Sequence, residues 1–494
     1  MKLNMKVTNK IKMKPLICIA ITWLGLLLVA SCSDQPAVPK YQVIEQKTAG
    51  NMTHKRQYAS YIYPGQGVDN QQKLEFWSGF SFFRDPWITA PSATGNRDGL
   101  GPLFNTRSCV ACHTAGSRAQ LDKPGEILPL SLVVRLGSTQ ASTEVGRTEV
   151  DPVYGGQIQP RAIRYRLLDI KQDNLGEAWL YFDYTVKQGS FNDGEPYELL
   201  KPNYQLTKLA YGELAPHIGL SVRLAPNIYG MGLLDAIKVK DLLAQEDIND
   251  SDGDGISAKY NRVPNVLTTA ETGVFQIGRF GFKAKQPNLH QQVAAAFRDD
   301  IGIINSSFSE DTCSKTQVAC IQASASGGHD SENLEIDDRR LSLTVTFNAL
   351  MGVPATRGLY NKQEQQGRRL FYQLACQKCH TPSYITGDHT KYPALAQQTI
   401  WPYTDLALHD MGDELADGVF EFDANGHEWR TPPLWGIGLQ KKMTGQQRFL
   451  HDGRARTISE AILWHGGEAA PAKKAYSALT KQHRNALIKF IKAI

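Results

Sequence analysis

The chain has 494 residues, of which 41% are hydrophobic and 21% carry a formal charge, so it can form about two to four domains with substantial cores. Its net charge of +5 arises at the N-terminus, where five lysines precede the first acidic residue, Asp34. The remaining basic and acidic side chains balance, and no basic patch with interleaved aromatic residues occurs. These features argue against a nucleic-acid partner.

The N-terminus has the pattern of an export signal. Lysines are followed by an apolar run over residues 15–29, which is too short to span a bilayer comfortably. The run ends in Val-Ala-Ser-Cys32, which resembles a bacterial lipobox, where the cysteine is lipidated. We therefore predict a lipoprotein signal peptide over residues 1–31, with a plain signal peptide as the alternative, and a flexible tether over residues 32–60. Because Ser33 and not Asp follows the cysteine, we expect an exported, periplasm-facing lipoprotein in the outer membrane of a Gram-negative bacterium, held to the membrane only through this anchor.

Two C-x-x-C-H motifs are the strongest chemical signals in the chain. They consist of Cys109, Cys112 and His113, and of Cys376, Cys379 and His380. This motif is typical of haem c attachment, in which two thiols form thioethers with the haem vinyl groups and the histidine becomes the proximal iron ligand. A redox dithiol would not need the histidines, and a zinc site made of the two cysteine pairs would leave them unexplained. The sequence therefore predicts two covalently bound haem c groups.

A helical pattern is repeated before the two motifs. Its residues are spaced i, i+3 and i+4: Gly79, Phe82 and Phe83 in one copy, and Gly367, Leu370 and Phe371 in the other. Glycine on such a face permits close helix crossing. The chain ends in a predicted amphipathic helix with the apolar stripe Leu479, Leu487, Phe490, Ile491 and Ile494. These patterns predict two cytochrome c-like modules, the second closed by the terminal helix.

His465 is the predicted second axial ligand of the C-terminal haem. Thr457 and Glu460 form a capping-box pattern, which places a helix start near Ile458. His465 then shares a helical face with the apolar residues Ile458 and Ile462. His451, in the preceding loop, is the alternative ligand.

The two cysteines outside the signal, the anchor and the motifs are Cys313 and Cys320. In an oxidising compartment, a close pair of this kind favours a disulfide over two free thiols. We predict a Cys313–Cys320 disulfide that fixes a surface loop.

An acidic loop resembles the first half of an EF-hand calcium site. Asp250, Asp252 and Asp254 alternate with small residues, and Gly255 follows at the tight turn. The twelfth position is Asn261, which cannot close the site in the bidentate way that Glu does. We predict one calcium ion in a structural role, with a solvated acidic turn as the alternative.

Several longer motifs resemble known di-haem enzymes. The C-terminal segments R-T-P-P-L, L-H-D-G and T-I-S-E-A begin at Arg430, Leu450 and Thr457 and resemble bacterial di-haem cytochrome c peroxidases. The segments D-G-L-G-P-L-F-N, G-M-G-L-L-D-A-I and F-G-F-K-A begin at Asp98, Gly230 and Phe280. They resemble the related bacterial di-haem oxidoreductase family, whose members are also labelled thiol oxidoreductases. The resemblance extends over nearly the whole mature chain.

The resemblance implies candidate catalytic residues near the first haem. The segment after Leu289 is similar to the peroxidase stretch with a distal Gln and Glu, which places Gln292 and Asp300 at those positions. A carboxylate above an open haem can move the proton that peroxide cleavage requires, and Asp299 is the alternative to Asp300. The resemblance therefore implies a peroxidase-like oxidoreductase that acts on a small oxidant such as hydrogen peroxide and exchanges electrons with a periplasmic donor or acceptor.

The chain departs from the peroxidases at three positions. His465 stands where they have an axial Met, and His/His ligation implies a lower reduction potential. No histidine occurs between His113 and His217, so the first iron is expected to be five-coordinate or to take a distant ligand such as Met231 or His217. Phe280 and Phe282 stand near the position of a peroxidase Trp between the haems, so electron transfer that uses this Trp would differ. The alternative function is a non-enzymatic electron-transfer subunit of a neighbouring periplasmic protein, for example in iron handling.

We expect a mainly α fold made of two cytochrome c-like haem modules. The first covers residues 61–350 and contains a β-rich insertion at about 120–270, where alternation after Leu130 and Ala178 indicates strands. The second covers residues 351–494.

Overall fold

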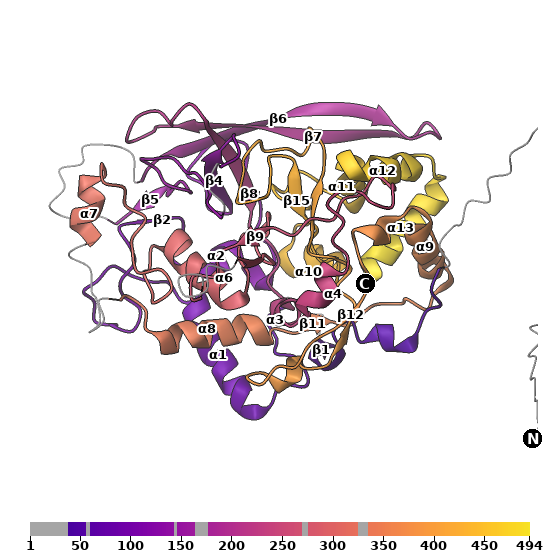
Figure 1. Ribbon diagram of the computed structural model, residues 1–494, viewed down its shortest axis with the longest axis horizontal. Helices are drawn as coiled ribbons and strands as arrows, with labels where there is room; N and C mark the ends of the chain where they lie inside the picture. The colour runs from indigo at the N-terminus through magenta and orange to yellow at the C-terminus, as the bar shows by residue number, and fades with distance from the viewer. Residues whose placement is uncertain (1–37, 56–59, 143–145, 164–175, 269–274, 325–333) are drawn as a thin grey trace, which may run out of the picture. The chain divides into compact units, whose positions relative to one another are not determined.

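Two helix pairs, each next to one C-x-x-C-H motif, organise the fold (Figure 1). The computed structural model describes residues 38–55, 60–142, 146–163, 176–268, 275–324 and 334–494. The predicted signal peptide and Cys32 lie outside these ranges. Residues 38–494 form one compact unit.

Most helices of the described residues belong to the two motif regions. Their bounds are α1 Asn70–Arg84, α2 Cys109–Cys112, α3 Met231–Asp235, α4 Val239–Leu243, α6 Leu289–Ala296, α7 Val318–Ser324, α8 Asp338–Leu350, α9 Lys362–Gln373, α10 Gln440–Thr444, α11 Ile458–Trp464, α12 Ala470–Ser477 and α13 Lys481–Ala493. Helix α1 packs on α8, and α9 packs on α13. A Cβ atom on Gly79 would overlap the carbonyl oxygen of Leu343, and one on Gly367 would overlap that of Ala486. The two glycines therefore permit the close helix crossings.

The prediction of a mainly α fold is wrong, because helix accounts for 30% of the structure and strand for 19%. The strands are β1 Thr53–His54, β2 Leu103–Phe104, β3 Gly125–Ile127, β4 Leu132–Ser138, β5 Arg161–Ala162, β6 Trp179–Ser190, β7 Pro196–Thr207, β8 Ile218–Leu224, β9 Arg262–Val263, β10 Gln276–Ile277, β11 Val353–Pro354, β12 Tyr384–Ile385, β13 Thr399–Ile400, β14 Leu408–Asp410 and β15 Glu428–Arg430. They form a three-stranded antiparallel sheet, β3-β6-β7, and several two-stranded sheets. Many of these sheets join strands that are distant in sequence, so hydrophobic periodicity could not reveal the pairing.

The β6–β7 hairpin joins the two motif regions. It starts beside β4 and β8, where the sequence predicted a β-rich insertion, and extends to α11 and α12 (Figure 1). At its tip, the Phe191 ring packs edge-on against Tyr476 of α12, with ring centroids 6.0 Å apart. Arg484 of α13, whose side chain is only 4% exposed, pairs with Asp193 at 2.9 Å and Glu195 at 2.6 Å. The hairpin thus holds the C-terminal helices against the rest of the unit.

The segment predicted as a tether packs partly into this unit. Residues 43–46 and 50–52 form short 3₁₀ turns, and β1 pairs in parallel with β11. Ala49 and Met52 are fully buried. Hydrophobic anchoring therefore starts before residue 60, where the sequence predicted the first module to begin.

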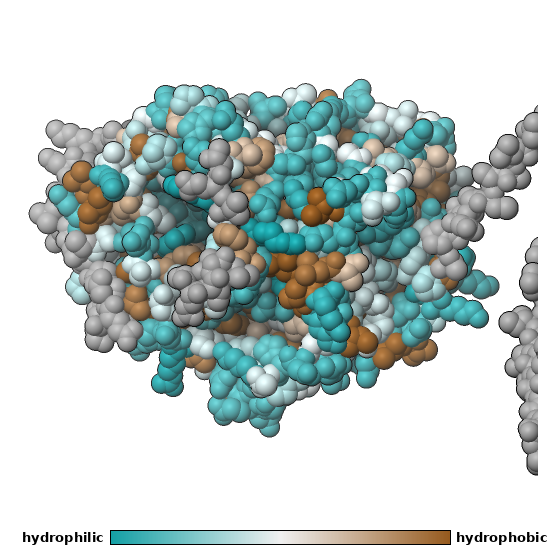
Figure 2. Space-filling view, in the orientation of Figure 1, coloured by the Kyte–Doolittle hydropathy of each residue, from teal (hydrophilic) through white to brown (hydrophobic). Residues whose placement is uncertain are grey.

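The face seen in Figure 2 is mainly hydrophilic, and its hydrophobic residues form separate small groups. Within the described ranges, every helix is too short or too polar to cross a bilayer.

Candidate functional site

Both C-x-x-C-H motifs line a single cavity of about 670 Å³. Their four cysteines form no disulfide among the described residues, and burial raises the pKa of Cys112 and Cys376 to about 12. Thiols this difficult to ionise are poor nucleophiles. The surroundings therefore do not favour a redox dithiol.

Each motif histidine is oriented by a backbone carbonyl. His113 Nδ1 lies 2.9 Å from the carbonyl oxygen of Pro226, and His380 Nδ1 lies 3.0 Å from that of Tyr403. Since a carbonyl oxygen only accepts, each Nδ1 must carry the proton, and each Nε2 keeps its lone pair. Burial lowers the pKa of both histidines to about 4. Both are therefore neutral imidazoles in the tautomer that binds iron through Nε2.

The repeated pattern before the motifs supports these histidines from one side. Phe83 lies 6.1 Å from the His113 ring, and Phe371 lies 6.5 Å from the His380 ring. Both phenylalanines come four residues after the crossing glycine of their helix. The two sites are thus built in the same way on their proximal sides.

His465 lies at the C-terminal end of α11, which begins at the predicted Ile458 with the side chain of Thr457 as its cap. Its Nδ1 is 2.7 Å from the carbonyl oxygen of Ala461, so its Nε2 is also available. His465 lines the cavity and acts electrostatically on His380. The alternative, His451, instead stacks face to face on Trp429, with ring centroids 3.8 Å apart. The structure therefore favours His465 as the partner of His380.

Asp300 and Gln292 line the cavity together with the first motif. Asp300 lies in a π-helical turn, Phe297–Ile301, that continues α6. Its backbone carbonyl accepts hydrogen bonds from the amides of Asn105 and Thr106, just before the motif. Its carboxylate acts electrostatically on the Cys109 thiol. The contacts of Asp300 thus lie beside the first motif, and Gln292 lines the same cavity.

The environments of the two neighbouring carboxylates differ. Asp299 pairs with Arg298 at 2.7 Å and with Arg135 at 3.0 Å. Burial would raise the pKa of Asp299, but these cations outweigh burial and lower it well below its usual range. Asp300 accepts one hydrogen bond from Gln157, at 2.9 Å, and burial raises its pKa. Of the two carboxyl groups, Asp300 is therefore the one whose neutral form is favoured, and Asp299 stays ionised.

The structure places the two distant candidate ligands of the first iron, His217 and Met231, in different surroundings. His217 is half-exposed and pairs with Glu149 at 2.8 Å, and it is not among the residues that line the cavity. Met231 does line the cavity. Phe280 and Phe282 lie there as well, and Phe282 meets Trp429 edge-on, with ring centroids 6.4 Å apart. A Trp is thus present beside the predicted phenylalanine position, but it comes from another segment.

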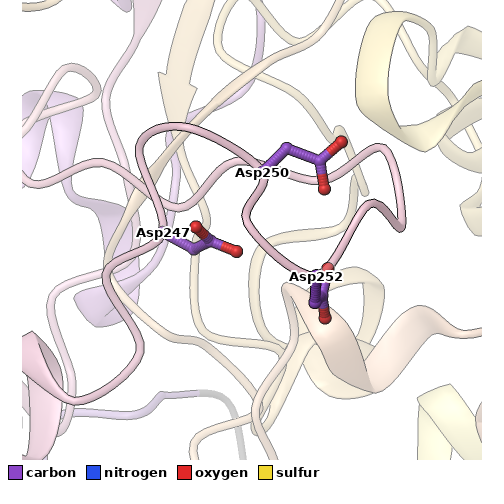
Figure 3. Close-up of side chains that lie close together, drawn as sticks. All are labelled: Asp247, Asp250 and Asp252. Atoms are coloured by element: carbon purple, nitrogen blue, oxygen red, sulfur yellow. The ribbon is translucent and has the colours of Figure 1, made fainter.

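The acidic loop gathers a set of carboxylates that differs from the predicted one. Asp247, Asp250 and Asp252 bring carboxylate oxygens within 4.8 Å of one another (Figure 3). Asp254 instead pairs with Lys378, inside the second haem motif. Asp247 was missed because it precedes the EF-hand-like pattern. The loop therefore contacts the second haem site through Asp254.

A disulfide joins Cys313 and Cys320 in the structure. The loop that it closes leads into α7, and none of its residues lines the cavity.

The cavity is lined by a guanidinium group with two nitrogen atoms that have no hydrogen-bond partner among the described residues. This group belongs to Arg448, and the two atoms are its buried Nε and Nη1. Its backbone is held by Arg118, which donates to the carbonyl oxygens of Arg448 and Leu450. A buried guanidinium needs an anionic partner, and haem carries two propionates. Haem therefore fits both the cysteine-histidine motifs and this unpaired charge.

Fold and site together define a di-haem protein, with one haem position at each repeated helix pair and both facing one cavity. A family model described as "Di-haem oxidoreductase, putative peroxidase" matches residues 49–494. The chain belongs to this di-haem oxidoreductase family, and the family predicted from the motifs is confirmed. A comparison with curated proteins found no match.

Proposed function

We propose that this protein is an exported c-type cytochrome that reduces a small oxidant, with hydrogen peroxide as the leading candidate, at its first haem. Electrons would pass between this haem and the His380/His465 haem, which exchanges them with a periplasmic partner. Both haems would be attached covalently. The mature chain would begin at a lipidated Cys32 in the outer membrane, which the mass of the mature protein tests.

The difference between the two haem positions carries this proposal. His380 has a second imidazole in the same cavity, that of His465, which acts on it electrostatically. The other cavity-lining histidines do not oppose His113 in this way, because His451 stacks on Trp429 and His409 is held between two carboxylates. Asp300 instead acts on Cys109 of the first motif, and Gln292 lines the same cavity. One position is thus suited to electron transfer and the other to substrate.

Peroxide reduction consumes two electrons and two protons and yields two waters. The haem, when bound, supplies the redox-active iron. Asp300, with its raised pKa, takes a proton from the bound peroxide oxygen and returns it to the departing one. Gln292 lies on the same wall and orients the peroxide by hydrogen bonding. The apolar walls of the cavity, Phe280 among them, restrict access of water.

The test is the spin state of the ferric holoprotein together with its peroxide turnover. We expect one high-spin haem that binds added imidazole, one low-spin haem, and turnover with a reduced cytochrome or a chemical reductant. Two low-spin haems without turnover would contradict the proposal and support an electron-transfer subunit.

We also propose that Asp247, Asp250 and Asp252 bind one calcium ion. Their carboxylates converge, and hard oxygen ligands are those that calcium prefers. Calcium should raise the thermal unfolding midpoint of the holoprotein relative to a chelator-treated sample, and Asp252→Asn should reduce this shift by at least half. An identical midpoint with and without calcium would refute the site. Asp413→Asn, at an exposed carboxylate outside the group, is the matched control.

A further inference from the structure

Lys285 places an ammonium group in the cavity beside the proposed catalytic pair. It lines the cavity with a side chain that is 17% exposed. A Cβ on Gly281 would lie 3.4 Å from Lys285 Cγ and 4.0 Å from Gln292 Oε1, so Lys285 and Gln292 approach the same point. Lys285 also acts electrostatically on Asp300. Lys285, Gln292 and Asp300 therefore share one wall.

Among the described residues, the ammonium of Lys285 has only a distant ion-pair partner. Its nearest carboxylate is Asp299, at 3.9 Å, which is beyond hydrogen-bonding range. Asp299 is already paired with Arg298 and Arg135 at shorter distances. A lysine with a purely structural role would be expected to form a close pair, because an unpaired buried charge costs free energy.

The other charges around Lys285 largely cancel. Glu421 faces it but pairs with Arg223 at 3.0 Å, and Asp299 is neutralised as described. Asp300 is the remaining acid, and burial favours its neutral form. With Asp300 protonated, the charge of Lys285 is left uncompensated toward the cavity. An anion that enters the cavity would balance it.

We propose that Lys285 determines the substrate class of the first haem site by selecting small anions, including the hydroperoxide anion, over neutral ligands. This inference rests on the proposed open position at the first haem. The ammonium stabilises the negative charge of the bound oxidant, while Asp300 holds the proton that this oxidant released. Anion binding therefore requires protonated Lys285 and is favoured by protonated Asp300.

Ligand binding to the ferric holoprotein separates charge selection from general access. Azide and fluoride are anions at neutral pH, and imidazole is a neutral ligand of the same iron. In Lys285→Gln, we expect the dissociation constants of azide and fluoride to rise about 10- to 100-fold, because one nearby charge is lost in a poorly screened site. Lys285→Arg should keep them within about threefold, and imidazole affinity should not change. Lys441→Gln, at an exposed lysine of α10, is the matched control.

The pH dependence of azide binding gives a second test that needs no Lys285 variant. Burial, together with the charge of Arg135, lowers the pKa of Lys285 to about 8. Azide affinity should therefore fall as the pH rises through about 8, while imidazole affinity does not fall in this range. The groups that face Lys285 from neighbouring elements are Asp299, Asp300, Arg135, Arg223 and Glu421. Of these, paired Asp299 and Glu421 stay ionised over this pH range. Asp300, whose pKa is raised, can also lose a proton as the pH rises, so Asp300→Asn is measured in parallel to isolate the titration of Lys285.

The outcomes distinguish the inference from the proposed function. If imidazole binds but azide affinity is the same in Lys285→Gln and in the wild type, the role of Lys285 is refuted and the open haem stands. If neither ligand binds the wild-type ferric protein, the proposed function fails as well. If Lys285→Gln does not fold, the pH profile of Asp300→Asn decides: loss of azide affinity through pH 8 in that variant supports the inference, and a flat profile overturns it.

Discussion

Replacement of Asp300 by Asn should lower kcat/KM for peroxide about 10²- to 10⁴-fold, the usual contribution of a positioned acid or base. The amide keeps the size of the side chain but cannot accept a proton. Because Asp300 must be ionised to act as a base and its pKa is raised, the wild-type rate should increase with pH through this elevated pKa. That acid limb should be absent from Asp300→Asn. Stopped-flow or steady-state peroxide assays across pH provide the measurement.

Two further variants define the role of Asp300. Asp300→Glu, which keeps a carboxylate at the end of a longer side chain, should retain most of the activity. Imidazole binding should be similar in all three proteins, which shows that the haem site is intact. If Asp299→Asn abolished turnover and Asp300→Asn did not, the neighbouring carboxylate would be the catalytic group.

Replacement of His465 by Ala should convert the second haem from low spin to high spin. His380 would be left as its sole protein ligand, because His409, which also acts electrostatically on His380, is held between Asp405 and Glu468. Loss of the His465 ligand should also slow electron supply to the first haem, so turnover with a protein donor should decrease by at least tenfold. Electron paramagnetic resonance of the ferric protein measures the spin change directly.

Added imidazole is the sharpest control for His465→Ala. The truncated side chain leaves space for a free imidazole, which should restore the low-spin signal. His451→Ala should leave the spin state unchanged, because His451 stacks on Trp429. A low-spin second haem in His465→Ala, together with its loss in His451→Ala, would reverse the assignment.

Sequence patterns predicted the parts of the site that depend on local spacing. A C-x-x-C-H motif places its ligands within five residues, and a capped helix fixes the direction of His465 from Thr457. The glycines that permit helix crossing were also visible, since Gly79 and Gly367 sit in repeated contexts. Such features need no knowledge of the tertiary fold.

Tertiary contacts determine the features of the site and of the strands that sequence patterns could not predict. Asp299 and Asp300 are equivalent in sequence, but Arg135 of β4 pairs with only one of them. Asp254 pairs with Lys378, which is distant in sequence, and is therefore not part of the acidic group. The short strands form between distant segments for the same reason, as β1 and β11 show. Long-range pairing of this kind explains why the β content was underestimated.

The most direct test of the account is the intact mass of the purified mature protein under denaturing conditions. We predict a chain from Cys32 to Ile494 that carries two haems and the lipid on Cys32. Non-covalent cofactors are lost on denaturation. Both haems will therefore remain on the chain only if thioether bonds attach them. A polypeptide with one haem or none would contradict the assignment of Cys109, Cys112, Cys376 and Cys379.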